Sequence, residues 1–178
     1  MIQEQLDHRF CYSNHKMIRQ VNPESDAGVI TDIYNYYISS TTISFETETI
    51  SVEEMKLRIT QISTDFPYLV YENLKGEVIG YCYAHLWKER AAYHLTLETT
   101  IYLRRDCAQN GVGTALMREL IKQCSQRGYK SLIACITADN IPSINFHSKL
   151  GFTKVSHFKN GGIKFGNMLD VVDFQLSL

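Results

Sequence analysis

The stretch ETTIYLRRDCAQNGVGTALMREL, residues 98–120, decides the fold. Its beginning continues an alternation of polar and apolar residues from Leu95 to Leu103, which predicts a strand with one buried face. Its end repeats apolar residues at helical spacing, which predicts a helix from Gly111 to Arg127 that stops at Gly128. The first turn of that helix carries unpaired, partly positive amides. Such a loop can hold a phosphate or pyrophosphate, but taken alone it favours an ordinary strand-to-helix turn.

This loop matches neither of two common phosphate motifs. It lacks the Gly-Lys-Ser or Gly-Lys-Thr ending of a P-loop. It also lacks the third glycine of a dinucleotide fingerprint and comes late in the chain. The surrounding elements therefore decide between the two interpretations of the loop.

The first half of the chain predicts two helices and three strands. A strand at 17–21 is followed by Asn22-Pro23, which opens a helix. Ser51 and Glu54 form a capping box at the start of a second helix. A hairpin over 68–85 follows, with its turn at Lys75-Gly76. The buried stripe of the first helix consists of Ile30, Ile33, Tyr34, Tyr37 and Ile38.

The second half predicts three more strands and another helix. An apolar run predicts a strand over 131–136, and a helix begins at Pro142 and stops at Gly151. Strands over 152–158 and 167–176 close the chain. The predicted order is β-α-α-β-β-β-α-β-α-β-β. This order indicates an α+β or three-layer α/β fold, with helices on the faces of the sheet.

Length and charge limit the classes of function. The chain has 178 residues and a formal net charge of −1, so it suits one domain and has no basic excess for nucleic acid. No apolar run approaches the roughly 18 residues of a membrane-spanning helix. Residues 1–16 are polar and lack the apolar centre of a signal peptide, so we expect a flexible leader before one domain over 17–178.

Five widely spaced cysteines predict a reducing compartment, the cytoplasm, and no disulfide framework. One spacing admits a metal site, because His8, Cys11 and His15 could approach one ion. Structural zinc sites have four closed ligands, and no fourth ligand is near in the sequence. We therefore expect no metal.

Several stretches together resemble the GCN5-related N-acetyltransferase (GNAT) superfamily. These are the strand and glycine loop already quoted and the helix from Asn140 to Gly151-Phe152. Within the superfamily the chain resembles phosphinothricin and methionine sulfoximine acetyltransferases, from about Met17 to Leu176. That closer likeness is carried by IYNYY at 33–37, FE at 45–46, WKERAAY at 87–93, ETTIY at 98–102 and KFGNMLDV at 164–171. The loop departs from the superfamily pattern at Ala108, where Gln or Arg is usual.

The resemblance implies a GNAT fold, with a mixed and mostly antiparallel central sheet flanked by helices. It also implies acetyl-CoA as the cosubstrate, without a metal. The pantetheine arm would lie along Ile101, Tyr102 and Leu103, and Asn140 would contact it from the far side. Asn140 is also a good helix N-cap, and the two roles are compatible. The pyrophosphate would lie on the loop residues Gln109, Asn110, Gly111, Val112, Gly113 and Thr114.

Two side chains are candidates for proton transfer. Glu98 is the candidate base, provided that burial raises its pKa or water relays the proton; a surface glutamate is the alternative. His147 stands where many superfamily members carry a tyrosine that protonates the leaving thiolate. It could act as an acid, act as a base or be a packed structural residue. A covalent acetyl-cysteine at Cys107 or Cys135 is not expected, because neither thiol has a base beside it in the sequence.

The resemblance implies a small amino acid or analogue as the acceptor amine, and a homodimer. Lys88 and Arg90 could bind its anionic groups, and a solvated turn is the alternative for these two residues. The alternatives are a polyamine, an aminoglycoside or a protein N-terminus as the acceptor, or a CoA-binding sensor without turnover. The other candidate acceptor-binding residues are Tyr36, Phe45, Tyr93, Thr99 and Thr100.

Overall fold

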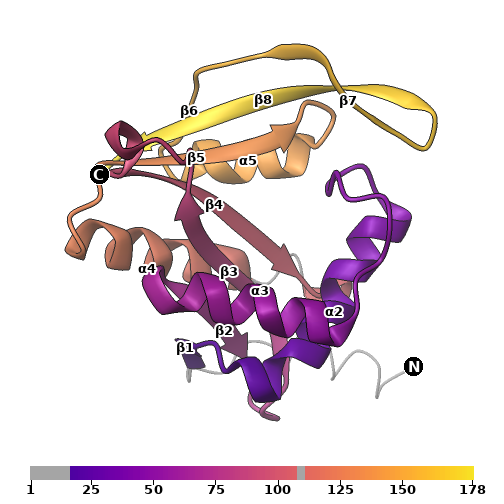
Figure 1. Cartoon of the computed structure of the whole chain (residues 1–178), viewed down its shortest axis with the longest axis vertical. Helices are drawn as coiled ribbons and strands as arrows, with labels where there is room; N and C mark the ends of the chain where they lie inside the picture. The colour runs from indigo at the N-terminus through magenta and orange to yellow at the C-terminus, as the bar shows by residue number, and fades with distance from the viewer. Residues whose placement is uncertain (1–16, 108–110) are drawn as a thin grey trace.

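An eight-stranded sheet runs through residues 17–107 and 111–178, which are the residues that the computed structural model describes (Figure 1). The strand order is β1-β2-β3-β4-β5-β8-β6, and β7 pairs with β8. Only β4 and β5 pair in parallel. The strands are β1 (Met17–Gln20), β2 (Tyr68–Glu72), β3 (Val78–Leu86), β4 (Thr96–Leu103), β5 (Ser131–Thr137), β6 (Thr153–Lys154), β7 (Phe158–Lys164) and β8 (Asn167–Ser177).

Helices cover both faces of this sheet. On one face α2 (Pro23–Ser40) and α3 (Val52–Asp65) pack on β2, β3 and β4, while α4 (Val112–Gln126) and α5 (Ile141–Lys149) lie behind the sheet (Figure 1). Each face has its own apolar core. The mixed, mostly antiparallel sheet between helical layers confirms the predicted fold class.

The predicted helix signals act as expected. The Asn22 side chain accepts a hydrogen bond from the Glu24 amide at 2.9 Å, and Ser51 accepts one from the Glu54 amide at 3.1 Å. These caps satisfy amides that have no partner inside their helix. Just after the last turn of α4, Gly128 has a φ of +87°, a left-handed conformation that favours glycine at the end of a helix.

The prediction for the last strands was partly wrong. The strand predicted over 152–158 is only the two-residue β6, and a longer strand, β7, begins at Phe158. Its sequence FKNGGIK has no alternation to reveal it. Hydrogen bonds to β8 impose the extended backbone instead, with an irregular register between Phe158 and Gly162. The observed order therefore has one strand more than the predicted order.

Two negative observations apply to the described residues. Within 17–107 and 111–178, no helix is long and apolar enough to cross a membrane. In the same ranges, no three His, Cys, Asp or Glu side chains gather as a metal site would require. The candidate ligands His8, Cys11 and His15, and the predicted leader over 1–16, lie outside the described residues.

Candidate active site

Strands β4 and β5 separate directly after Glu98. They pair only from Thr96 to Glu98, opposite Ser131 to Ile133. Beyond this point β5 pairs with β8 and β4 pairs with β3, and Figure 1 shows the two strands diverging. The edge of β4 after Glu98 therefore has no strand partner on this side among the described residues. Such an edge offers N–H and C=O groups to an extended ligand.

A cavity of about 390 Å³ lies in this opening, and we call it the α4 cavity. Its walls are the free edge of β4, the beginning of α4 and the beginning of α5. The residues that line it are Tyr37, Ile43, Ile101, Tyr102, Leu103, Gly111, Gly113, Thr114, Asn140, Pro142, Ser143 and Phe146.

The start of α4 is suited to an anion. Gly111 is the N-cap, with a φ of 75°, and no side chain caps the first turn. The first amides of the helix therefore keep their unpaired N–H groups and the positive end of the helix dipole. A phosphate or pyrophosphate is the ligand that such a helix start binds best.

Gly113 keeps the α4 cavity open. A Cβ atom at this position would lie 3.3 Å from Leu103 Cδ1 and 3.5 Å from Phe146 Cε2. A larger side chain would fill the space between the strand edge and α5. Glycine here allows the helix to approach the β4 edge closely.

Most residues predicted to contact CoA line the α4 cavity. Val112 is an exception, because its side chain is buried in the core beneath the first turn. Gln109 and Asn110 lie outside the described residues, as does Ala108. Asn140 is the predicted N-cap, and its side chain accepts a hydrogen bond from the Ser143 amide at 3.2 Å.

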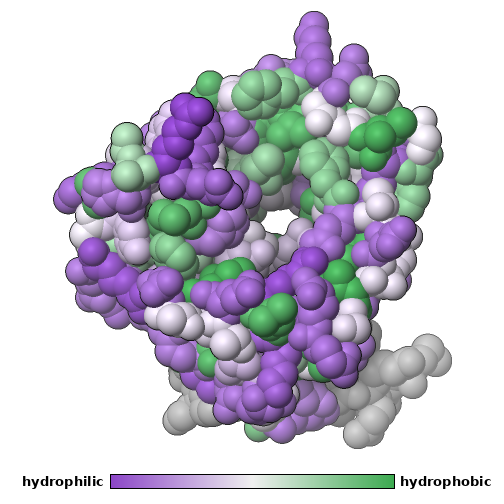
Figure 2. All heavy atoms as spheres, in the orientation of Figure 1, coloured by the Kyte–Doolittle hydropathy of each residue, from purple (hydrophilic) through white to green (hydrophobic). Residues whose placement is uncertain are grey.

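A second pocket of about 450 Å³ opens on the other side of the separated strands, and we call it the Glu98 pocket. It shares five lining residues with the α4 cavity, so the two spaces are continuous. Figure 2 shows that the molecule is hollowed at the centre of this face. The shared residues are Ile43, Ile101, Tyr102, Asn140 and Ser143.

Glu98 lies in this pocket at the point where the strands part. Burial raises the pKa of its carboxyl group above the ordinary value of 4.5. The imidazole of His85, which is opposite Glu98 on β3, lowers the pKa, while the carboxylate of Asp173 raises it. The net direction is upward, toward the range in which a carboxylate works as a base near neutral pH.

His147 is almost completely buried, with 3% of its surface exposed, yet it lines the Glu98 pocket. Its Nδ1 lies 2.9 Å from the Ser143 carbonyl oxygen, so Nδ1 carries the proton and Nε2 accepts. Burial lowers the pKa of the imidazole, which favours the neutral ring. Phe146 and Phe152 contact the ring edge-on. A neutral ring suits a proton acceptor or a structural residue better than an acid.

The residues predicted to bind the acceptor amine fall into two groups. Phe45, Thr99 and Thr100 line the Glu98 pocket. The structure does not place Tyr36 there: it points outward from α2, and Arg105 lies 5.9 Å above its ring.

The predicted cations also lie elsewhere. Lys88, Arg90 and Tyr93 surround a separate depression beyond the end of β3. The Lys88 ammonium is 4.0 Å from the centre of the Trp87 ring. Among the described residues that line the Glu98 pocket, none is lysine or arginine.

Sequence reasoning missed other pocket residues. Tyr34 was on the predicted buried stripe of the first helix, so the helical period was a signal for Tyr34 instead of Tyr36. His85 and Tyr83 enter through the register of β3 with β4, which no local pattern reveals. Glu46 and Cys135 come from a loop and from β5.

One polar atom in this pocket has no partner. The Thr137 hydroxyl is buried, lines the Glu98 pocket and makes no hydrogen bond to any described residue. Buried hydroxyls are normally paired, so an unpaired one in a pocket wall is available to a ligand or water.

Comparisons with known proteins agree with this geometry. Residues 18–172 match the family model described as acetyltransferase (GNAT) domain. The chain is 35% identical over 147 residues to phosphinothricin N-acetyltransferase of Streptomyces viridochromogenes, covering 83% of this chain and 80% of that protein. It is 31% identical over 159 residues to the L-methionine sulfoximine/L-methionine sulfone acetyltransferase of Pseudomonas aeruginosa, covering 86% of this chain and 92% of that protein.

A solved structure shows the same arrangement. The phosphinothricin acetyltransferase of Sinorhizobium meliloti, a GNAT superfamily protein crystallised in complex with acetyl-CoA, matches with a TM-score of 0.88. The match has 34% sequence identity and covers 92% of this chain and 88% of that one. The chain therefore belongs to the acetyltransferase (GNAT) domain family and is an N-acetyltransferase that is similar to the phosphinothricin and methionine sulfoximine enzymes.

Proposed function

We propose that the protein transfers the acetyl group of acetyl-CoA to the amino group of a small amino acid or amino-acid analogue. One observation carries the proposal: β4 parts from β5 at Glu98, so a free strand edge, an uncapped helix start and a carboxyl group of raised pKa meet in continuous cavities. The acceptor type follows the names of the phosphinothricin and methionine sulfoximine relatives.

In this proposal the α4 cavity holds the cosubstrate. The residues present fit it, because the free edge at Ile101–Leu103 suits an amide-bearing arm and the amides from Gly111 to Thr114 suit a pyrophosphate. Asn140 closes the cavity from the α5 side. Bound acetyl-CoA would supply the thioester carbonyl carbon that the amine attacks; the carbon–sulfur bond would then break, and CoA would leave as a thiol with the proton that the amine nitrogen loses.

Glu98 prepares the acceptor amine. An alkyl ammonium titrates near pH 10, so it must lose a proton before it can attack. The carboxylate of Glu98 accepts that proton, directly or through a water molecule, and its raised pKa makes the transfer easier at neutral pH. Its place at the vertex of the separated strands puts it beside the cavity that would hold the thioester.

The properties of Cys135 and His147 fit direct transfer of the acetyl group to the amine, without an acetyl-cysteine intermediate. Burial, with the Glu98 and Asp173 carboxylates, raises the pKa of the Cys135 thiol to about 12. The thiol is therefore protonated at neutral pH and is a weak nucleophile. His147 with its neutral ring is a second proton acceptor in the same pocket.

A specific observation favours a second candidate, a polyamine or another cationic amine as the acceptor. Two carboxyl side chains, Glu46 and Glu98, line the pocket, without a lysine or arginine among its described lining residues. Arg58 forms an ion pair with Glu46 at 2.5 Å and offsets part of this negative charge. The names of the relatives place the amino-acid acceptor first and the cationic acceptor second.

A thiol-release assay tests the proposal. Purified protein with acetyl-CoA is supplied with a panel that includes methionine sulfoximine, phosphinothricin, proteinogenic amino acids, a polyamine and an aminoglycoside. We expect rapid thiol release with the amino-acid analogues. Faster release with the polyamine would select the second candidate. Binding of acetyl-CoA with no amine-dependent release would reject an acetyltransferase of small amines and leave a protein N-terminus as the acceptor or a sensor without turnover.

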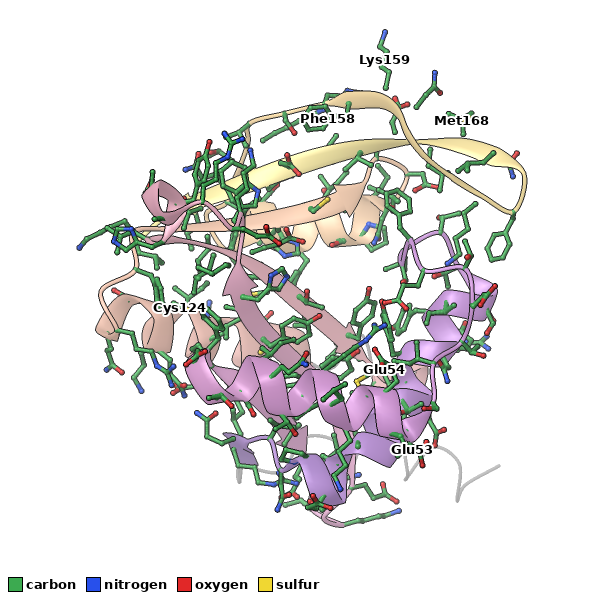
Figure 3. All side chains as sticks on the ribbon, viewed as in Figure 1. Glu53, Glu54, Cys124, Phe158, Lys159 and Met168 are labelled. Atoms are coloured by element: carbon green, nitrogen blue, oxygen red, sulfur yellow. The ribbon has the colours of Figure 1, made fainter. Side chains whose placement is uncertain are left out.

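A homodimer is also part of the proposal. The hairpin of β7 and β8 exposes apolar side chains at the outer edge of the molecule, where Figure 3 shows Phe158 and Met168. Ile163 pairs with Met168 across the hairpin, and Phe165 stands at its turn. Exposed apolar patches mark interaction sites. Light scattering should give twice the chain mass of 20.5 kDa, and the mass of one chain would contradict the dimer.

The cytoplasm is the proposed location. Among the described residues, Cys82, Cys124 and Cys135 are free thiols. Free thiols persist in a reducing compartment. Fractionation of cells that express the full chain tests the location.

A further inference from the structure

The loop between α2 and α3 forms one wall of the Glu98 pocket. Four consecutive residues from Ile43 to Glu46 line the pocket. On the helical side, Glu46 accepts hydrogen bonds from Tyr34 at 2.9 Å and from Arg58 at 2.5 Å. These bonds hold one end of the wall against α2 and α3.

A buried lysine holds the same loop from the opposite side. Lys164, the last residue of β7, has only 2% of its surface exposed. Its ammonium donates a hydrogen bond to the carbonyl oxygen of Ser44 at 2.5 Å. Burial lowers the pKa of this ammonium, and Glu46 opposes that shift. Lysine is almost never fully buried without a partner, so this bond is the main compensation that the structure shows.

A glycine in the same strand makes an independent contact. The ring of Phe45 lies on Gly162, where a Cβ atom would be 3.2 Å from Cζ and 3.3 Å from Cε2. Residues two apart in a strand point to the same face, so Gly162 and Lys164 meet the loop together. The contact pairs Phe45–Gly162 and Ser44–Lys164 form what we call the β7 latch.

The latch acts on one of the two cavities. Its loop residues Ser44 and Phe45 line the Glu98 pocket and not the α4 cavity. The phosphate-binding amides of α4 belong to a different part of the wall. Ile43, at the start of this loop, lines both cavities. Loss of the latch should therefore disturb the acceptor side strongly and the cosubstrate side only weakly.

We propose that Lys164 is a positioning residue for the acceptor amine: with Gly162 it fixes the loop from Ile43 to Glu46 as the wall of the Glu98 pocket. This inference rests on the proposed function, because it assigns the Glu98 pocket to the acceptor. Lys164 begins the KFGNMLDV stretch that carries the resemblance, and the latch gives this lysine a specific contact with the pocket loop.

The experiment compares the full-length wild-type protein with Lys164→Met, which keeps the length of the side chain but loses its charge and donor. Gly162→Ala crowds the latch at its other contact and pushes on the Phe45 ring. Gly161→Ala is the matched control, because its Cβ would meet Val171 of β8 at 3.1 Å instead of the loop. Two quantities are measured: hydrogen exchange of the amides at 42–48, and KM for each substrate.

We expect faster exchange at 42–48 in Lys164→Met and Gly162→Ala but not in Gly161→Ala. The acceptor KM should rise about tenfold, in line with the loss of one charge-assisted hydrogen bond, while the acetyl-CoA KM changes less than about twofold. Unchanged loop exchange, an unchanged acceptor KM, or an equal rise in both KM values would overturn the inference. If the wild-type protein acetylates no amine, the proposed function fails, and exchange still decides whether the latch exists.

Discussion

The α4 cavity and the Glu98 pocket share five residues, yet they are built in different ways. The α4 cavity has apolar side chains in its walls, and the features that suit it to the cosubstrate are backbone: a strand edge that β5 has left and the first amides of a helix capped by glycine. The Glu98 pocket presents side chains that come from α2, the following loop, β3, β4, β5 and α5. A backbone site is insensitive to most substitutions, whereas a side-chain pocket can change its ligand with a few of them.

This difference suggests how one fold can keep its cosubstrate while the acceptor varies. Amides of a helix start bind phosphate whatever the neighbouring side chains are, provided that nothing blocks their approach. Carboxylates, hydroxyls and aromatic rings instead define one acceptor. The following predictions test whether the two regions are separate in this sense, from the largest effect to the smallest.

The largest effect is expected from Glu98→Gln, which removes the proton acceptor and keeps the shape of the side chain. We expect kcat to fall by about one hundredfold or more, the usual contribution of a general base. The affinity for acetyl-CoA, measured by calorimetry, should not change, because Glu98 lies outside the α4 cavity. Glu53→Gln on the outer face of α3 is the control (Figure 3). Wild-type turnover in Glu98→Gln would remove Glu98 from the mechanism.

Gly113→Val should weaken binding of acetyl-CoA in the α4 cavity. Its side chain would occupy the space between Leu103 and Phe146, so the dissociation constant of acetyl-CoA should rise about tenfold or more. Gly28→Val in α2 is the control, because a Cβ atom there meets nothing within 4 Å. A variant that binds acetyl-CoA normally would show that the α4 cavity is not the cosubstrate site.

The pH dependence of kcat should show the raised pKa of Glu98. The base works only when deprotonated, so kcat should rise with pH through this pKa and fall about tenfold per unit below it. Because burial raises the pKa, the rise should lie at higher pH than for a carboxyl group with the ordinary value of 4.5. Glu98→Gln should lose this rise but keep the one due to the acceptor ammonium. A rise that persists unchanged in Glu98→Gln would belong to another group.

Thr137→Val should affect only the Glu98 pocket, and its effect should be smaller than those of Glu98→Gln and Gly113→Val. Its hydroxyl has no partner among the described residues, so its loss should not lower the melting temperature. We expect the acceptor KM to rise by a few fold, about the effect of one neutral hydrogen bond. In the control Thr31→Val, the lost hydroxyl is bonded to the Ala27 carbonyl, so the melting temperature should fall and KM should not change. Equal behaviour of both variants would count against a ligand contact at Thr137.

The smallest effects are shifts of the pH profile in opposite directions. The Asp173 carboxylate raises the pKa of Glu98, so Asp173→Asn should move the rise in kcat to lower pH. His85 lowers that pKa, so His85→Gln should move the rise to higher pH. Shifts in the same direction for both variants would show that these neighbours do not act through their charges.

The amount that could be predicted differs between the two regions. Gly111, Gly113 and the strand before them are adjacent in the sequence, and all three belong to the α4 cavity. In the Glu98 pocket, Glu98 and Phe45 were predicted, whereas Glu46, His85 and Cys135 were not. Tyr36 was predicted to bind the acceptor, whereas the helical period of apolar residues places Tyr34 on the inner face, and Tyr34 lines the pocket. Lys88 and Arg90 were expected in the pocket on resemblance, and the structure places them around a separate depression.

The sequence by itself determined the helix starts, most strand positions, the order of the layers and the loop that begins α4. These features depend on local periodicity, capping and glycine, which act over a few residues. Only the tertiary structure decided that β4 and β5 part at Glu98, that His85 faces it, and that Lys164 reaches Ser44 across 120 residues of chain. Strand register and side-chain burial depend on how distant segments pack, and no short stretch of sequence contains that information.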